Sequence, residues 1–435
     1  MTESDLGRLY AAHLKERQEK TEAALGASGF DALVIHSGTP LRYHADDQEA
    51  PFRATPHFAH WLPLEEANDL LIVRPREKPM LVRYVPDDFW REYASLDPSF
   101  WSSAFEIAEA KSVESLFNHI AVAHSEGKTA YIGDNPEEAK AHGVSAERVN
   151  PPELLALLDR DRSLKTGYEV ACIAEANRIA APGFAAAKVA FLEEKDELGI
   201  HHAYLSAVGA TERELPYETI VALNEKGAIL HYQGKRRGVQ GKSLLLDAGA
   251  RYLGYCSDIT RIWAADDADP LFKELIAGVE KLQQELCAEA KPGLPFSEFQ
   301  KNTHVKIGNL LNALGVLKVD GKKGAELKLT NAFFPHGVGH FLGIQVHDVG
   351  SERTKEGDTL RNTTVITEGQ VFTIEPGVYF NELLLKPHRS GDKSAYFDWN
   401  LIDRLAPYGG VRIEDDVYVN KNGVRNLTKE SSYDF

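Results

Sequence analysis

Cysteine is scarce in this chain of 435 residues, where Cys172, Cys256 and Cys287 lie far apart. Their spacing is not typical of a metal site, so we interpret them as free thiols in a reducing cytosol. Long apolar runs are also lacking, since none approaches the ~20 residues that a membrane span needs. The first residues, MTESDLGRLY, have neither the basic nor the apolar region of a signal peptide. These absences predict a cytoplasmic protein with no membrane partner.

Positive charge is in deficit, because 49 lysines and arginines stand against 65 acidic residues and give a net charge of −16. Such a chain is poorly suited to a phosphate backbone, so no nucleic-acid partner is predicted. The acidity by itself indicates only solubility. With 43% hydrophobic and 26% charged residues the composition is that of an ordinary globular protein, and the length favours two domains.

The N-terminal part shows α/β patterning without a catalytic cluster or a phosphate-binding glycine loop. A helix is predicted over residues 6–25. Short apolar runs predict further elements, namely strands within residues 31–37, 69–75, 79–86 and 129–134. Asn150-Pro151-Pro152 and the charged run after it interrupt the pattern. We therefore predict an N-terminal α/β domain over residues 1–158 and a second domain over residues 159–435.

The second domain is predicted to begin with helices and to continue with strands. A long alanine-rich helix covers about residues 168–193, and Pro182 is expected to kink or interrupt it. The elements predicted after it are a helix at about 197–208, strands at 219–223, 228–232, 243–250 and 252–263, helices at about 270–290 and 296–314, and a strand-rich C-terminus.

The most informative stretch is FFPHGVGHFLGIQVHD, residues 333–348, which holds three histidines and three glycines. Glycine allows sharp turns and close approach to the backbone, so a loop of this kind can direct several imidazoles to one point. A surface loop that happens to carry histidines would have the same composition. The choice between these two interpretations depends on the rest of the chain.

Acidic residues interrupt several apolar runs elsewhere in the second domain. Asp247 and Asp258 bracket LLLDAGARYLGYCSD, which is typical of a β-hairpin, and Glu375 and Glu414 lie in FTIEPG and VRIEDD. Surface aspartates are the alternative, but Asp247 directly follows three leucines, and a buried charge is costly unless it is compensated. A pair of divalent cations would compensate four carboxylates and bind one imidazole. Oxygen-rich ligands suit manganese better than cobalt or zinc.

Five potential ligands follow one another in the order Asp247, Asp258, His340, Glu375 and Glu414. With the surrounding PHGVGH, TIEPG and RIED, this order resembles the M24 metallopeptidases of pita-bread fold. The segments SGTPLRYHADD, LPYETIVALN and PYGGVRIEDD are similar to the bacterial Xaa-Pro dipeptidase (prolidase) branch, which includes the organophosphorus acid anhydrolases. The resemblance covers essentially the whole chain. It implies a creatinase-like α/β N-terminal domain and a C-terminal pita-bread catalytic domain.

The resemblance also implies roles for individual residues. The five ligands would hold two divalent ions, and Glu375 could also act as general base. The catalytic residues would further include His347 as the donor to the oxyanion, Arg412 beside the last glutamate, and His336 in the lining of the pocket. The substrate would contact His231, Arg361, Asp47, Trp90 and Tyr217, with Arg361 gripping a terminal carboxylate.

The activity implied by the resemblance is hydrolysis of dipeptides with C-terminal proline by a homodimer. An aminopeptidase acting on longer Xaa-Pro peptides is the alternative, organophosphate hydrolysis is a possible side activity, and some pita-bread domains only bind partners. The chain departs from the family at Thr364, where close relatives have a second arginine, and in VGSERTKEGDT, which is short. Both departures affect the expected carboxylate pocket, and neither affects the metal ligands.

Overall fold

The structure is a computed structural model that describes residues 2–93, 96, 99–125, 127–350 and 364–431. The chain forms two compact units that divide between Glu169 and Val170, and each unit is described by itself. Helix α5 (Pro152–Arg162) belongs to the first unit. The boundary predicted between residues 158 and 159 falls inside this helix.

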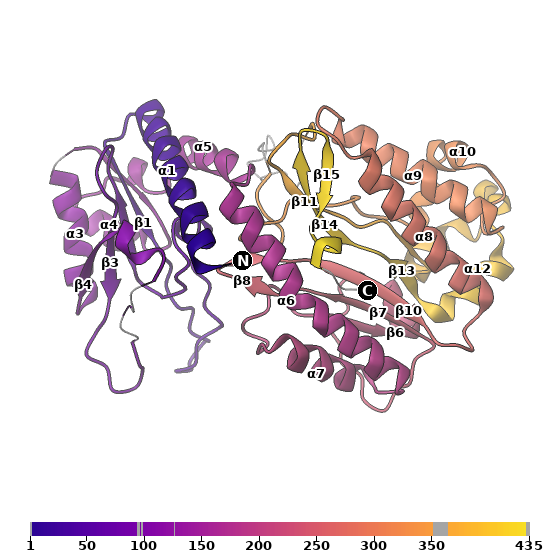
Figure 1. The fold of residues 1–435 in the computed structure, drawn as a ribbon. Coiled ribbons are helices and arrows are strands. Elements are labelled where there is room, and N and C mark those ends of the chain that lie inside the picture. The colour runs from indigo at the N-terminus through magenta and orange to yellow at the C-terminus, as the bar shows by residue number, and fades with distance from the viewer. Residues whose placement is uncertain (1, 94–95, 97–98, 126, 351–363, 432–435) are drawn as a thin grey trace. The chain divides into compact units, whose positions relative to one another are not determined.

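The first unit is built on a five-stranded mixed sheet (Figure 1). Its strands are β1 (Ala32–His36), β2 (Leu70–Val73), β3 (Met80–Tyr84), β4 (Glu106–Ala110) and β5 (Thr129–Ile132), in the order β4-β3-β2-β1-β5. Strand β1 pairs antiparallel with β2 and parallel with β5. All strands except β4 were predicted from their apolar runs.

Helices flank the sheet of the first unit. They are α1 (Glu3–Ser28), α2 (Pro56–Ala59), α3 (Val113–Ser125), α4 (Pro136–Ala141) and α5, with short 3-10 turns at Ser102–Ala104 and Ala146–Arg148. Val34, Ile72 and Val82 from the strands are buried against Phe117 from α3. Helix α1, predicted over residues 6–25, begins where Thr2 accepts a hydrogen bond from the Asp5 amide and ends at Gly29 in the left-handed conformation.

The second unit contains a three-stranded antiparallel sheet that is covered on both faces. Its strands are β6 (Ile220–Leu223), β7 (Ser243–Ala248) and β10 (Ile259–Ala264), in the order β10-β7-β6. Val221 and Leu246 pack toward helices α6 (Gly167–Leu192) and α7 (Glu197–Val208). Ala222 and Leu245 belong to the core formed with α8 (Pro270–Glu289) and α9 (Phe296–Ala313). Successive residues of a strand face opposite sides, and the two pairs of helices lie on opposite sides of this sheet (Figure 1).

A second group of strands completes this unit. The remaining elements are β8 (Arg251–Tyr252), β9 (Tyr255–Cys256), α10 (Gly321–Glu326), β11 (Val371–Ile374), β12 (Gly377–Tyr379), α11 (Glu382–Leu385), α12 (Trp399–Leu405), β13 (Gly410–Arg412), β14 (Asp415–Asn420) and β15 (Gly423–Asn426), with several 3-10 turns between them. A β-bridge between Thr260 and Glu414 joins β10 to the start of β14. Two segments far apart in the sequence therefore meet where the predicted ligands lie.

The structure corrects two predictions for this unit. Residues 228–232 do not form a strand: the chain turns at Asn224, with φ of 59°, and runs as a 3-10 helix over Asn224–Ala228. That helix packs backbone to backbone on Gly409, where an added Cβ would lie 2.2 Å from the Asn224 carbonyl oxygen. Interruption of the helix at Pro182 is also excluded, because α6 continues across this residue. The expected kink there stays a prediction.

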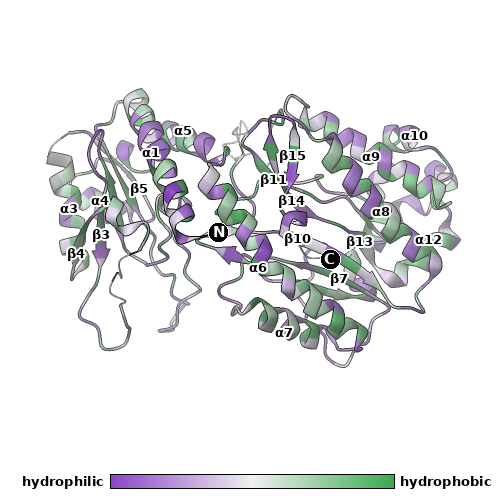
Figure 2. Ribbon diagram, viewed as in Figure 1, coloured by the Kyte–Doolittle hydropathy of each residue, from purple (hydrophilic) through white to green (hydrophobic). Residues whose placement is uncertain are grey.

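Helices α8 and α9 carry hydrophobic residues on one face and hydrophilic residues on the other (Figure 2). Phe272 and Leu275 of α8 and Phe299 and Ile307 of α9 are buried in the core. Within the described part of the chain, no helix combines the length and the apolar character that crossing a membrane requires.

Candidate metal centre and active site

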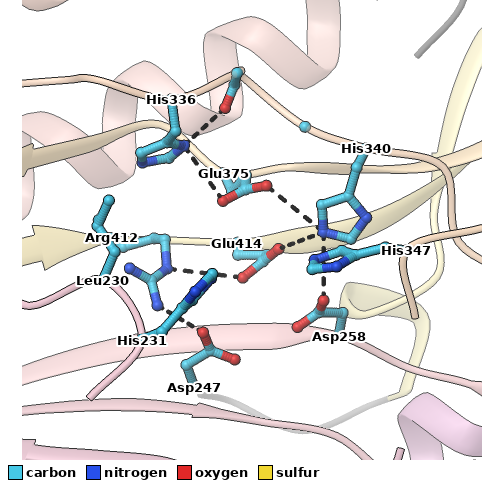
Figure 3. Close-up of a pocket in the computed structure, with 12 residues that line it drawn as sticks. Leu230, His231, Asp247, Asp258, His336, His340, His347, Glu375, Arg412 and Glu414 are labelled. Carbon is cyan, nitrogen blue, oxygen red and sulfur yellow. Dashed lines mark hydrogen bonds and ion pairs between the residues drawn. The ribbon is translucent and has the colours of Figure 1, made fainter. Parts of the chain in front are cut away.

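A cavity of about 320 Å³ in the second unit gathers nine of the predicted residues (Figure 3). They are His231, Asp247, Asp258, His336, His340, His347, Glu375, Arg412 and Glu414, and Leu230, Gly337 and Gly339 complete the lining. All three histidines of residues 333–348 line this cavity. The loop therefore brings its imidazoles together, as the sequence predicts.

The four acidic ligands expected from the sequence come from four separate positions in or directly beside the strands. Asp247 lies within β7, and Asp258 directly precedes β10, which pairs antiparallel with β7. The hairpin predicted between them is confirmed, with β8 and β9 joined at Leu253 and Gly254. Glu375 follows β11, and Glu414 lies between β13 and β14. The antiparallel strands bring acids that are far apart in the sequence to one cavity.

His340 lies at the centre of three carboxylates. Its Nε2 is 3.4 Å from Asp258 Oδ2, 3.7 Å from Glu375 Oε1 and 4.0 Å from Glu414 Oε1 (Figure 3). Ligands that share an ion at about 2.0–2.2 Å stand roughly 3–4 Å apart. The donor atoms of Asp258, His340 and Glu414 all lie within 4.8 Å of one another. This spacing suits a divalent ion between them.

The His340 ring is oriented by the backbone. Its Nδ1 donates to the carbonyl of Phe341 at 3.0 Å, so Nε2 faces the carboxylates, as in a metal-binding histidine. Despite burial, the neighbouring Asp258 and Glu375 raise the pKa of His340 to about 9, and a bound metal would take the place of the Nε2 proton. Gly339 is needed directly before it, because an added Cβ would lie 1.8 Å from the carbonyl oxygen of Thr373. The amide of His340 donates to the Thr373 hydroxyl at 3.2 Å. The glycine therefore lets the loop lie flush against β11.

Asp247 is held by two polar side chains. Arg412 Nη2 donates to Asp247 Oδ2 at 2.6 Å, and the Tyr217 hydroxyl lies 2.8 Å from Asp247 Oδ1. The same hydroxyl lies 2.5 Å from Asp258 Oδ1. Tyr217 was predicted to bind substrate. Its hydroxyl instead contacts both predicted ligands, so this residue is placed to position them. One hydroxyl proton cannot serve both acids, and a cation between them would satisfy the acid that is left without it.

Three residues of the site were missed by the sequence analysis. Thr260 donates to Glu414 Oε2 at 2.6 Å and accepts from Arg412 Nε at 3.0 Å. Tyr379 contacts Arg412 Nη1 at 3.0 Å and His336 Nε2 at 2.9 Å. Gln300 of α9 binds the loop that carries the histidines. Thr260 lies two residues after Asp258, and Tyr379 lies four residues after Glu375. This closeness to predicted ligands was the only sign in the sequence that they belong to the site.

The protein groups that line the cavity do not balance its negative charge. Four carboxylates surround the single guanidinium of Arg412 among the residues that line it. Burial and the neighbouring Asp258 raise the pKa of Glu414 well above its ordinary value, and burial raises the pKa of Glu375 to about 7. Burial likewise raises the pKa of Asp247, although Arg412 opposes the shift. Divalent cations would remove this cost, so the donor set fits the expected metal.

The other predicted histidines surround the carboxylates. The ring of His347 stands perpendicular to that of His340, with the ring centroids 4.4 Å apart. His336 Nδ1 lies 3.6 Å from Glu375 Oε2, and burial together with Arg412 lowers the pKa of His336 to about 3. This histidine is therefore neutral. His231 also lines the cavity (Figure 3).

Among the described residues, three predicted substrate contacts do not line this cavity, namely Asp47, Trp90 and Tyr217. Arg361 lies outside the described residues. Asp47 and Trp90 line a different pocket, of about 1,040 Å³, within the first unit. The side chain of Trp90 is 82% exposed and that of the adjacent Phe89 87% exposed. The structure brings Asp47 and Trp90 together, and their part in substrate binding stays a prediction.

The α/β fold and a cavity of buried carboxylates and imidazoles define a metal-dependent hydrolase. The chain belongs to metallopeptidase family M24, whose model matches residues 171–421. A second model, described as the N-terminal domain of Xaa-Pro dipeptidase, matches residues 8–159. The expected arrangement of an N-terminal α/β domain followed by a pita-bread domain is thereby confirmed.

Relatives of similar length support this assignment. A protein of Aeromonas hydrophila named Xaa-Pro dipeptidase is 40% identical over 98% of this chain and 99% of its own length. A protein of the same name from Marinobacter nauticus is 41% identical over 99% of this chain and 100% of its own length. Aminopeptidase P of Escherichia coli superposes with a TM-score of 0.74 over 100% of this chain and 96% of its own, at 20% identity. At that identity the last comparison concerns the fold alone.

Proposed function

We propose that this protein is an Xaa-Pro dipeptidase, which hydrolyses the bond between any residue and a C-terminal proline. The observation that carries the proposal is the convergence of four carboxylates and one imidazole in a single cavity, with Asp247, Asp258 and Glu414 buried. The nearly full-length similarity to proteins named Xaa-Pro dipeptidase supports the choice of substrate. Proline lacks an amide N–H and has a fixed ring, so its peptides suit a dedicated pocket.

Two divalent ions, manganese in the first place, are the proposed cofactors, with cobalt and zinc as alternatives. Asp247, Asp258, His340, Glu375 and Glu414 would hold them. Oxygen donors outnumber the one nitrogen donor, which favours manganese. When bound, such a pair supplies a nucleophile from water near neutral pH and polarises the scissile carbonyl.

The proposed work of the protein groups follows from their positions. Glu375, whose Oε1 lies 3.7 Å from His340 Nε2, would accept a proton from the attacking water. His347 donates to the carbonyl oxygen as negative charge develops there. Arg412 would keep Asp247 and Glu414 in place. It donates a hydrogen bond to Asp247, forms an ion pair with Glu414 at 3.9 Å and donates to Thr260, which in turn holds Glu414. His231 and the neutral His336 would line the space left for the substrate.

Selection of dipeptides is proposed to depend on the two ends of the substrate. Arg361 would pair with the proline carboxylate in bidentate fashion, and Asp47 would meet the α-amino group while Trp90 walls the pocket. An aminopeptidase on longer Xaa-Pro peptides is the second candidate, and Thr364 in place of an arginine favours it. Organophosphate hydrolysis is a side activity that the same nucleophile permits.

One set of assays tests the main proposal. Purified protein should contain divalent metal and turn over Ala-Pro faster than Ala-Pro-Ala. Chelation should remove activity and added manganese should restore it. Asp258→Asn should abolish activity, because a neutral amide is a weak ligand between two cations. Full activity after exhaustive chelation, with no metal bound, would overturn the mechanism, and a preference for Ala-Pro-Ala would favour the aminopeptidase.

The proposed assembly is a homodimer with twofold symmetry, located in the cytoplasm. The exposed aromatic pair Phe89 and Trp90 supports a subunit contact, because large exposed aromatics are uncommon outside binding surfaces. The three free cysteines support a reducing compartment. Sedimentation at several protein concentrations tests the assembly.

A further inference from the structure

A second cluster of possible metal ligands lies in the first unit. His13 from α1, His60 directly after α2 and Glu169 from the first turn of α6 each offer a donor atom within 4.8 Å of the others. All three side chains are buried, with exposed fractions between 1% and 6%. None of these residues belongs to the cavity described above, and none has a part in the proposed peptidase mechanism.

The hydrogen bonds of His13 fix its tautomer. Its Nε2 lies 2.8 Å from the carbonyl oxygen of His60, and a carbonyl only accepts, so Nε2 carries the proton. The lone pair of His13 is therefore on Nδ1, which faces Glu169 Oε2 at 3.8 Å. An imidazole with one nitrogen bonded to a backbone carbonyl and the other free to ligate is the arrangement of metal-binding histidines. The Thr166 hydroxyl, 2.8 Å from Nδ1, would rotate away or join the ion's shell.

His60 and Glu169 leave room between them for a cation. His60 Nε2 is buried and forms no hydrogen bond, yet it lies 3.3 Å from Glu169 Oε1. A buried polar nitrogen without a hydrogen-bond partner is unfavourable. Two ligands at about 2.0–2.2 Å from one zinc ion stand at a similar separation. The other oxygen of Glu169 accepts from the Thr166 amide at 2.9 Å, which holds the carboxylate in place.

The charge state of the cluster matches that of a ligand set. Burial and the nearby Arg17 lower the pKa of His60 well below its ordinary value, and burial lowers that of His13. Both imidazoles are then neutral at pH 7, the form that binds metals. Arg17 would also repel a cation, but its Nη2 lies 3.3 Å from Glu16, which offsets part of its charge.

We propose that His13 Nδ1, His60 Nε2 and Glu169 form a structural site for one zinc-like divalent ion, separate from the catalytic centre. Two imidazoles and one carboxylate are a ligand set of zinc, in contrast to the oxygen-rich set of the catalytic cavity. The ion would tie α1, the segment after α2 and the start of α6 to one another. It would stabilise the first unit and take no part in peptide hydrolysis.

Zinc content per chain tests the proposal. The full-length protein is stripped with a chelator, saturated with Zn²⁺, freed of excess metal and analysed for its metal content. The His60→Leu variant, which keeps a similar volume, should hold one zinc ion per chain fewer than the wild type. Glu169→Gln should lose the same equivalent while it keeps the acceptor for the Thr166 amide. His142→Leu, a change in the same unit outside the cluster, should lose none.

A crystal of the unaltered protein soaked in zinc provides a test that does not depend on variants. An anomalous peak bounded by His13, His60 and Glu169 is expected. Dipeptide hydrolysis by manganese-loaded His60→Leu should equal that of the wild type, so failure of this site is distinct from failure of the proposed function. Equal zinc content in the wild type and in folded His60→Leu, or a crystal with no peak at the cluster, would overturn the proposal.

Discussion

The hydroxyl of Thr260 donates to Glu414 Oε2 at 2.6 Å, across the β-bridge that joins β10 to β14. The same hydroxyl accepts from Arg412 Nε. One small side chain thereby fixes a predicted ligand from the C-terminal strands against the strand that follows Asp258. Partners of metal ligands of this kind are worth about 10–100-fold in metal affinity or activity.

Replacement of this hydroxyl should therefore weaken the metal centre. Thr260→Val keeps the shape of the side chain but leaves Glu414 and Arg412 without their shared partner, and we expect a fall of about 10–100-fold in metal affinity. Thr260→Ser retains the hydroxyl and should stay within a few-fold of the wild type. Titration of manganese into metal-free protein measures both. Equal affinity for the valine and serine variants would show that the hydroxyl does not support the ligand.

Gln300 holds both sides of the histidine loop. Its Oε1 accepts from the Val338 amide at 2.6 Å, and its Nε2 donates to the His336 carbonyl at 3.1 Å. Gln300→Met removes both bonds, and Gln300→Glu removes only the donor. We expect the free energy of unfolding to fall by about 1–3 kcal/mol per unpaired group, with the larger loss in the methionine variant. Denaturant unfolding of the metal-free protein measures it, and identical stability of all three proteins would contradict the assignment.

Substitution of His347 can distinguish a role in catalysis from a role in metal binding. If it donates to the developing oxyanion, His347→Ala should lower kcat by roughly 10²–10³, as for other such donors, while metal content stays near normal. Both quantities are measured on the same preparation. A variant that loses its metal would instead assign His347 to support of His340, whose ring it contacts.

The features of the fold and site that were predicted correctly are those that depend on neighbouring residues in the sequence. Asp247 follows three leucines in a buried strand, so both the strand and the unusual position of its charge are visible in the sequence. Glycines around His340 likewise indicated a tight loop, and Gly339 does lie against β11. The family motifs supplied the remaining ligands, which local patterns alone would have left ambiguous.

The missed part depends on residues that are distant in the sequence. Strand β4 has the sequence EIAEA and lies at the edge of its sheet with most side chains exposed, so it lacks the apolar run that identified the other strands. Residues 228–232 have a strand-like composition, but their course is set by contact with Gly409. Gln300 reaches the site from a helix whose pattern predicts only its buried face.

The last prediction concerns the pocket that Asp47 and Trp90 share in the first unit. The family resemblance implies that this loop reaches the active site of a neighbouring subunit and closes the substrate pocket. Asp47→Ala should then raise KM for free dipeptides and leave metal content unchanged, because it removes the partner of the α-amino group. A solvated loop in a monomer is the alternative, and for it the substitution would change neither quantity.

Mixed dimers decide whether the loop acts between subunits. One parent chain carries Asp258→Asn, which disables the metal centre, and the other carries Asp47→Ala, which disables the loop. If the loop acts in the partner's site, an exchanged dimer contains one site with an intact metal centre and an intact loop, and dipeptide turnover at low substrate concentration should rise above that of either parent. Differently tagged chains purified in tandem ensure that exchange has occurred. Turnover no higher than half that of the Asp47→Ala parent would place the loop and its metal centre in the same chain.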